Sequence, residues 1–200
     1  MNDDYWTHNT AYHSWIISQA KAKNRVIDIG CGDGLLIQRL SSICNHVIGI
    51  DTHAPSIEQA KQRLSNNKNA TVINIGFEDY VGSPNSFDLI IFVASLHHMN
   101  LEHSVSKAKG MLAPHGKLLV VGCASPHGFI DYIIEIARVL PARLGSHFRG
   151  EKKGGEIGVP TTKPTIGLIE IKRFSKRELP GVRIRRGLYF RYLLSWDNIE

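Results

Sequence analysis

The segment DIGCGDG over residues 28–34 restricts the fold of this chain more than any other feature. It follows an apolar run over 25–30 and precedes residues 35–43, whose apolar positions have helical spacing. Glycine lacks a Cβ, so a strand that enters a helix through closely spaced glycines lets the backbone approach a ligand. We therefore expect a βα unit with a ligand bound at the turn.

The same alternation continues along the chain. We predict strands over 46–51, 71–75, 87–93 and 117–122, a helix that begins at Pro55 and another helix over 101–112. Alternating strands and helices predict a mostly parallel sheet with helices on both faces. With right-handed crossovers this is a doubly wound, Rossmann-like α/β fold, which binds ligands at the carboxyl ends of its strands.

The pattern changes after the fifth strand. We predict an amphipathic helix over 129–140, a Gly-, Lys- and Pro-rich loop over 145–164, a helix over 164–174 and a hairpin over 182–196 that brings the sheet to seven strands. At 200 residues the chain can bury one core but not two, so we expect a single domain. Its parts are an N-terminal cover (1–24), a cofactor-binding core (25–123), an inserted cap and helix (124–180) and C-terminal strands (181–200).

The composition indicates the cellular compartment of the protein. The three cysteines, Cys31, Cys44 and Cys123, are odd in number and far apart, which favours reduced thiols in a cytoplasm. The polar first residues do not form a secretory signal. The apolar run over 89–94 is much shorter than the roughly 20 residues that cross a bilayer. We expect a cytoplasmic monomer or dimer without membrane insertion.

The net charge of +6 is concentrated near the C-terminus, where residues 141–200 hold 13 Lys/Arg against 6 Asp/Glu. The basic residues Arg143, Arg149, Lys152 and Lys153 suit an acidic metabolite or a peptide carboxylate, or form only a solvated surface. No recognisable nucleic-acid-binding motif accompanies them, which disfavours a nucleic acid partner and leaves RNA as a minor alternative.

Two carboxylates define the ligand of the glycine segment. A dinucleotide fingerprint needs G-x-G-x-x-G, and Leu35 occupies its third glycine position. Asp28 places a negative charge beside the turn, which disfavours a phosphate and favours a cation. Asp51, at the end of the second strand, can accept hydrogen bonds from both hydroxyls of a ribose, or can cap the next helix. Together they favour S-adenosyl-L-methionine (SAM), a nucleoside with an ammonium and a sulfonium.

In order and spacing, the segments VIDIGCGDG, GIDTH, FDLIIFVASLHHM and GMLAPHGKLLVVG resemble the class I SAM-dependent methyltransferases. The likeness covers residues 25–123. HNTAYHSWI and LPGVRIRRGLYFRYLLSW resemble a subgroup of small bacterial methyltransferases. The resemblance implies methyl transfer from SAM to a small-molecule or peptide acceptor, with S-adenosyl-L-homocysteine (SAH) as the second product.

The resemblance also implies which residues contact SAM. The amino acid end would be bound by Asp28, Gly30, Cys31 and Gly32, the ribose by Asp51 and the adenine side by Thr52, with Ala94 beside the methyl group.

One position departs from the pattern of this family. Many relatives have an aspartate at the end of the third strand, where this chain has Gly76. We expect Phe77 and Glu78 to contact the adenine instead. The alternative is that Glu78 and Asp79 form only a solvated turn.

The histidines His97 and His98 follow the fourth strand and are the candidate catalytic bases. A hydroxyl or amine acceptor must lose a proton, and an imidazole suits that step near neutral pH, whereas a carboxylate acceptor is already anionic. Oxygen methylation is the first expectation, with nitrogen and carbon methylation as the alternatives. The alternatives are that these histidines only shape the pocket or cap the next helix.

The N-terminal segment is dense in aromatic and imidazole groups. In relatives the chain before the first strand often covers SAM, so we expect Tyr5, His8 and Tyr12 to line the cofactor site, although they can equally pack a surface helix. No carboxylate or cysteine completes metal-ligand spacing with these histidines, so we expect no metal. Two other functions stay open from the sequence: a nicotinamide-dependent oxidoreductase and a SAM-binding module without catalysis.

Overall fold

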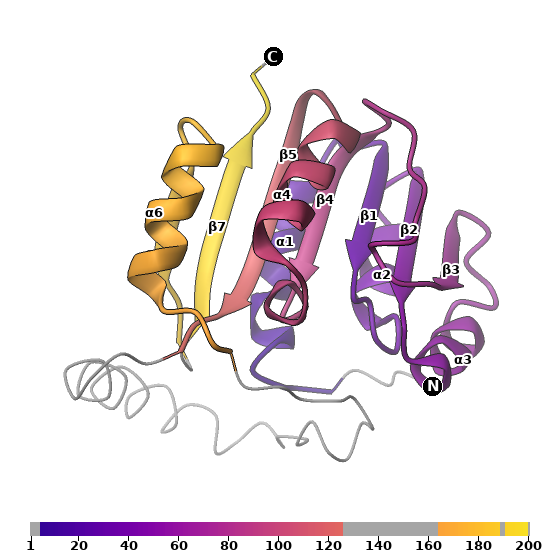
Figure 1. The fold of residues 1–200 in the computed structure, drawn as a ribbon. Coiled ribbons are helices and arrows are strands. Elements are labelled where there is room, and N and C mark those ends of the chain that lie inside the picture. The colour runs from indigo at the N-terminus through magenta and orange to yellow at the C-terminus, as the bar shows by residue number, and fades with distance from the viewer. Residues whose placement is uncertain (1–4, 126–163, 189–190, 200) are drawn as a thin grey trace.

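The computed structural model describes residues 5–125, 164–188 and 191–199. They form a seven-stranded sheet in the order β3-β2-β1-β4-β5-β7-β6, which confirms the predicted doubly wound α/β fold (Figure 1). The first five strands are parallel, β7 runs antiparallel to β5, and β6 runs antiparallel to β7. The strands are β1 (Arg25–Ile29), β2 (His46–Asp51), β3 (Ala70–Asn74), β4 (Phe87–Val93), β5 (Leu112–Cys123), β6 (Arg183–Arg186) and β7 (Arg191–Asp197).

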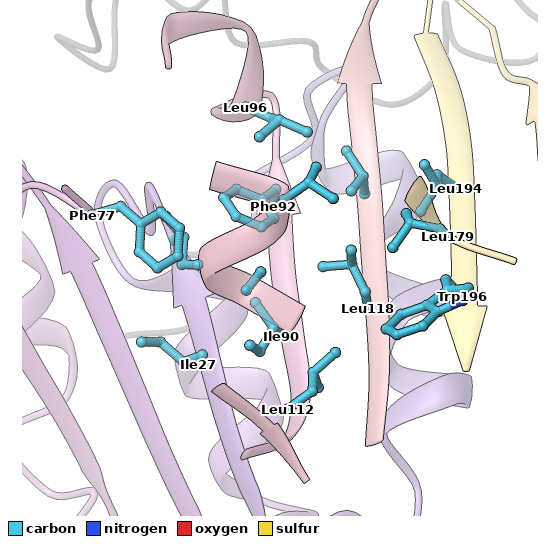
Figure 2. Packing of buried hydrophobic residues seen from close by; sticks show 14 of the residues in the cluster. Ile27, Phe77, Ile90, Phe92, Leu96, Leu112, Leu118, Leu179, Leu194 and Trp196 are labelled. Atoms are coloured by element: carbon cyan, nitrogen blue, oxygen red, sulfur yellow. The ribbon is translucent and has the colours of Figure 1, made fainter. Parts of the chain in front are cut away.

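Helices cover both faces of the sheet because its central strands are apolar on both sides. On β4, Ile90 and Phe92 face a core formed with α4 and α6, whereas Leu89 and Ile91 face a core formed with α1, α2 and α3. Figure 2 shows the first core, which extends from Ile27 to Trp196. The helices are α1 (His13–Ala20), α2 (Leu35–Ser41), α3 (Ala54–Arg63), α4 (Leu101–Met111) and α6 (Leu168–Glu178), with 3-10 turns η1 (Thr10–Tyr12) and η2 (Leu96–His98).

Several element boundaries differ from those predicted, and the largest differences are at the starts of β5 and α6. β5 begins at Leu112 because this residue pairs with Phe87 before the register shifts to Leu89 and Lys117. The last helix begins at Leu168 instead of residue 164, because residues 166 and 167 lie alongside Ser125 in an isolated parallel bridge. The predicted C-terminal hairpin is confirmed as β6 and β7.

Part of the predicted cap lies outside the described residues. This applies to the amphipathic helix over 129–140, to nearly all of the loop over 145–164 and to the basic residues Arg143, Arg149, Lys152 and Lys153. Within the described ranges, each helix is too short or too polar to cross a membrane.

Candidate active site

The carboxyl ends of β1, β2 and β4 border a pocket of about 560 Å³. In Figure 1 the arrowheads of β1, β4 and β5 point to this edge of the sheet. The volume is in the range of small-molecule and cofactor sites, roughly 300–1,000 Å³. Of the predicted site residues, those that line the pocket are Tyr5, His8, Asp28, Gly30, Cys31, Gly32, Asp51, Thr52, Phe77, Ala94 and His98.

The glycine turn is fixed by its backbone. Gly30, Gly32 and Gly34 have φ values of 80°, 55° and 76°, in the left-handed region where a side chain is strained. The N–H groups of Gly30 and Cys31 both donate to the carbonyl of Ile50, at 2.8 and 3.1 Å, which anchors the turn to β2. The turn therefore needs glycine for its conformation.

Asp28 lies at the floor of the pocket and is only 2% exposed. Its Oδ1 has no hydrogen-bond partner among the described residues. Burial, and secondarily the charge of Asp51, raises the pKa of Asp28 to about 7. A buried carboxylate oxygen without a donor is costly, and a ligand ammonium would satisfy it. This oxygen fits the amino group of SAM.

Asp51 accepts two backbone hydrogen bonds and still has acceptor capacity for a ligand. Its Oδ2 accepts from the N–H of Gly32 at 2.9 Å, and its Oδ1 accepts from the N–H of His53 at 2.8 Å. His53 is the N-cap residue of α3 and no side chain caps this helix, so the interpretation of Asp51 as a helix cap is wrong. Each carboxylate oxygen has a second lone pair, so acceptor capacity remains for a ribose diol.

The two residues predicted to contact adenine differ in their position relative to the pocket. Phe77 is buried, lines the pocket and meets Phe92 edge-on, with ring centroids 5.6 Å apart. Glu78 is not a lining residue: its side chain is 57% exposed and lies 3.8 Å from His103 Nε2. The ammonium of Lys107 donates to the carbonyls of Phe77 and Glu78, at 2.7 and 2.8 Å, and holds this turn with Glu78 outward. Glu78 is therefore outside the pocket lining, and its contact with adenine stays a prediction.

The two adjacent histidines border different cavities. His98 lines the main pocket, whereas His97 lines a second cavity of about 60 Å³ beside Ile171 of α6. Ala94, with φ of 53°, turns the chain sharply out of β4 into η2, and the two imidazole rings lie against each other with their centroids 4.1 Å apart. The helix-capping alternative is wrong, because Asn100 caps α4 through its side chain.

The N-terminal segment reaches the pocket through an interaction that was not predicted. The hydroxyl of Tyr5 donates to Asp33 Oδ1 at 3.0 Å, and Arg63 binds Asp33 Oδ2 at 2.7 Å. Burial and the charge of Asp33 raise the pKa of Tyr5, so the phenol stays protonated and able to donate. Tyr5 thus closes over the glycine turn.

Tyr12, which was expected to line the cofactor site, is not among the residues that line the pocket. Its hydroxyl oxygen lies 2.7 Å from the N–H of Leu188, from which it accepts, and 3.1 Å from the carbonyl of the same residue, to which it donates. These bonds tie the end of η1 to the β6–β7 hairpin. Tyr12 positions the N-terminal segment without touching the ligand space.

Replacing Tyr12 with phenylalanine tests this assignment. Tyr12→Phe should lower the free energy of unfolding by about 1–2 kcal/mol, because both backbone groups of Leu188 lose a partner. The affinity for SAH should change less than threefold, since the phenol is outside the pocket. Urea denaturation and calorimetry measure the two quantities, and a stable variant with much weaker SAH binding would contradict the placement.

Other lining residues were missed from the sequence. Ser95 donates to the carbonyl of Ile29 and thereby joins the end of β4 to the glycine turn. Arg191 of β7 donates to Asn9 Oδ1 from Nε at 3.0 Å and from a terminal nitrogen at 2.5 Å. Asn9 and Arg191 both line the pocket, although 182 positions separate them.

Comparisons with known proteins agree with this geometry. A family model described as a methyltransferase domain matches residues 26–116. An uncharacterized methyltransferase of Mycobacterium tuberculosis (strain H37Rv) is 28% identical over 97% of this chain and 98% of its own length. A ubiquinone biosynthesis O-methyltransferase of Glaesserella parasuis is 31% identical over 48% of this chain, which is 44% of that relative. The crystal structure of the N-methyltransferase NodS from Bradyrhizobium japonicum with SAH superposes with a TM-score of 0.62 at 16% identity, covering 99% of this chain and 90% of NodS.

Proposed function

Because this chain belongs to the class I SAM-dependent methyltransferases, we propose that it methylates an oxygen atom of a small-molecule or peptide acceptor, either a hydroxyl or a carboxylate. For a hydroxyl acceptor, His98 is the proposed base. The observation that supports this proposal is that His98 and the buried carboxylate of Asp28 line one pocket.

The cofactor half of the pocket is formed by β1, β2 and the segments that follow them. Asp28 would hold the ammonium of SAM, Asp51 the ribose hydroxyls, and Phe77 the adenine. Thr52 would lie beside the adenine, while Tyr5 and His8 cover the cofactor. Bound SAM supplies an electrophilic methyl group on a sulfonium sulfur. Burial and the nearby carboxylates raise the pKa of Cys31, so its thiol stays protonated and serves only as a wall of the site.

The acceptor half lies at the end of β4, where Ala94 and His98 border the pocket. Methyl transfer requires a nucleophile held in line with the S–CH₃ bond, so orientation can provide most of the acceleration. An acceptor hydroxyl also loses a proton, and an imidazole within hydrogen-bond reach can take it.

Oxygen is preferred to nitrogen as the accepting atom on two grounds. Four relatives named ubiquinone biosynthesis O-methyltransferases are 26–31% identical over about half of this chain. His98 offers a proton acceptor where a hydroxyl needs one. NodS, which shares the fold, is an N-methyltransferase, so the fold by itself does not select the accepting atom.

Transfer of labelled methyl from SAM to the small-molecule fraction of a cell extract tests the proposal. Once a hydroxyl acceptor is identified, His98→Gln should lower kcat by about 100- to 10,000-fold, because the proton loses its acceptor. Binding of SAH should change little.

His103→Gln is the matched control, since His103 lies on α4 with a 58% exposed side chain and does not line the pocket. It should retain kcat within about threefold. Equal kcat values for the wild type and His98→Gln between pH 6 and 9 would show that His98 is not the base. Methyl incorporation into amines alone would contradict oxygen methylation.

A further inference from the structure

A second cavity lies beside the main pocket, where the ends of β4, β5 and α6 come together. Its volume is about 60 Å³, and its wall includes Leu96 from the turn after β4, Cys123 at the end of β5 and Ile171 from the first turn of α6. The carboxyl ends of β4 and β5 lie at the same edge of the sheet as the active site, because the two strands are parallel. The cavity is therefore on the acceptor side of the site, and the methyl transfer proposed above gives it no role.

The wall of this cavity is mostly apolar. Aliphatic and proline side chains make up most of it, from Leu96, Met99, Leu101, Pro164, Ile166 and Ile171. Ligand sites are lined mainly by apolar groups, with a few polar groups that fix orientation. The second cavity has this composition, whereas the cofactor half of the main pocket contains the carboxylates of Asp28, Asp33 and Asp51.

The polar side chains in the wall are His97, Cys123, Thr165 and Tyr192. Burial raises the pKa of the Cys123 thiol, although the charge of Arg191 opposes the rise, and burial also raises the pKa of Tyr192. The thiol and the phenol are therefore uncharged near neutral pH. A charged ligand group would lose its hydration beside such a wall, so the cavity favours a neutral, apolar group.

The ring of Tyr192 forms one side of the cavity because β5 has a glycine opposite it. Gly122 pairs with Tyr192 across β5 and β7, and a Cβ added to Gly122 would lie 2.2 Å from Cζ of the tyrosine. The ring thus occupies the space that a side chain at Gly122 would fill. This side of the cavity is fixed by the pairing of two strands of the sheet.

The second cavity adjoins the acceptor half of the main pocket. Met99 lines both cavities, and the ring of His97 in the second lies 4.1 Å from that of His98 in the first, centroid to centroid. Methionine is unbranched and flexible, so its side chain adapts to groups of different shape. A ligand whose reacting oxygen lies near His98 can therefore extend past Met99 into the second cavity.

We propose that the second cavity binds a short aliphatic group of the methyl acceptor, next to the oxygen that is methylated. This inference rests on the proposed methyl transfer and names the class of its substrate. An apolar cavity that binds benzene has a volume of about 150 Å³, so a cavity of about 60 Å³ takes a group of about two to four carbons and excludes a ring. Each methylene buried there strengthens binding by about fourfold.

The first test asks which metabolites accept a methyl group. The small-molecule extract is separated on a reversed-phase column before incubation with enzyme and labelled SAM. Label should enter the retained fraction, whose molecules carry apolar groups. Label only in the unretained fraction would overturn the proposal, whereas label in no fraction would contradict the proposed methyl transfer itself.

The second test is independent of turnover. Crystals of the complex with SAH are exposed to xenon, which binds in apolar cavities of sufficient size. Xenon should be found between Met99 and Ile171. A cavity without xenon would overturn the proposal even if methyl transfer occurs.

A matched pair of variants on α6 assigns acceptor selection to this cavity. Ile171 is 4% exposed and lines the cavity, whereas Ile169, two positions before it, is 72% exposed. The identified acceptor is compared with an analogue whose aliphatic group is two methylenes longer. Ile171→Ala enlarges the cavity and should raise the ratio of kcat/KM for the longer to the shorter acceptor by about tenfold. Ile169→Ala should leave this ratio at the wild-type value.

The ratio separates selection from a loss of stability, because a structural defect lowers both kcat/KM values together. Both variants should bind SAH within about threefold of wild type, which also demonstrates that each is folded. Ile171→Val removes one methyl group and should shift the ratio by about threefold, so it provides the same measurement if the alanine variant does not fold. An unchanged ratio in the folded variants of Ile171 would overturn the proposal.

Discussion

Replacing Asp28 with asparagine should remove tight binding of SAM and SAH without destabilising the free protein. The ligand ammonium would lose the one buried carboxylate proposed to bind it, and losing such a charged partner costs about 2–5 kcal/mol, or roughly 30- to 3,000-fold in Kd. Calorimetry with SAH measures the effect on binding. A Kd within threefold of wild type would contradict the assignment of Asp28.

The pH dependence of stability provides the second part of this prediction. The pKa of Asp28 is about 7 in the folded protein against an ordinary 3.8, so the folded state binds the extra proton between these values. The stability contributed by this group therefore falls as pH rises from about 4 to 7. The asparagine variant lacks this loss, so its free energy of unfolding at pH 8 should equal or exceed that of the wild type.

Binding should follow the opposite trend. The ionised form of Asp28 binds the ammonium, so the affinity of the wild type for SAH should fall about tenfold per pH unit below 7, while that of Asp28→Asn stays flat. Asp88→Asn is the control: its Oδ2 accepts from the N–H groups of Asn24 and Arg25, at 3.0 and 2.8 Å, at the opposite end of β1. That variant should lose stability and keep its affinity for SAH.

Replacing Gly30 with alanine should cause the largest loss of stability among the glycine positions of the turn. Its φ of 80° is strained for alanine, and an added Cβ would overlap the Cβ of Ser95. Left-handed strain of about 1–2 kcal/mol and overpacking of about 1–3 kcal/mol together predict a loss of about 2–5 kcal/mol, or failure to fold.

Gly181→Ala separates these two causes. Gly181 has the nearly identical φ of 81°, but an added Cβ would meet nothing within 4 Å. It should lose only the strain contribution, about 1–2 kcal/mol, in urea denaturation. Equal losses for both variants would show that the contact with Ser95 is unimportant.

The sequence predicted the sheet well because its signals are local. β2 and β4 begin and end at the predicted residues, since each is an apolar run bounded by residues that end a strand. β5 begins earlier than predicted because Leu112 pairs with Phe87, which is distant in sequence. α6 begins later than predicted because Gly167, just before it, pairs with the equally distant Ser125. Local periodicity contains no information about such pairs.

The candidate site likewise contains some residues that local signals predict and others that only the fold brings together. Asp28 and Asp51 were predicted because they lie at strand ends, which a parallel sheet brings to one edge. The interaction of Asp33 with Arg63 spans 30 positions, and its pairing depends on how α3 packs. His97 and His98 are adjacent in sequence and their rings are 4.1 Å apart, yet only His98 lines the main pocket, a difference that their local sequence does not reveal.

The contacts between the N-terminal segment and the β6–β7 hairpin have a consequence for biosynthesis. Tyr12 bonds to Leu188 across 176 positions, and Asn9 bonds to Arg191 across 182. During translation, the residues of η1 therefore leave the ribosome long before their partners have been made. A chain that ends after β5 contains the whole glycine turn but lacks one wall of the pocket and the anchor of its cover. The last strand of the sheet thus completes the lining of the pocket and anchors the N-terminal segment.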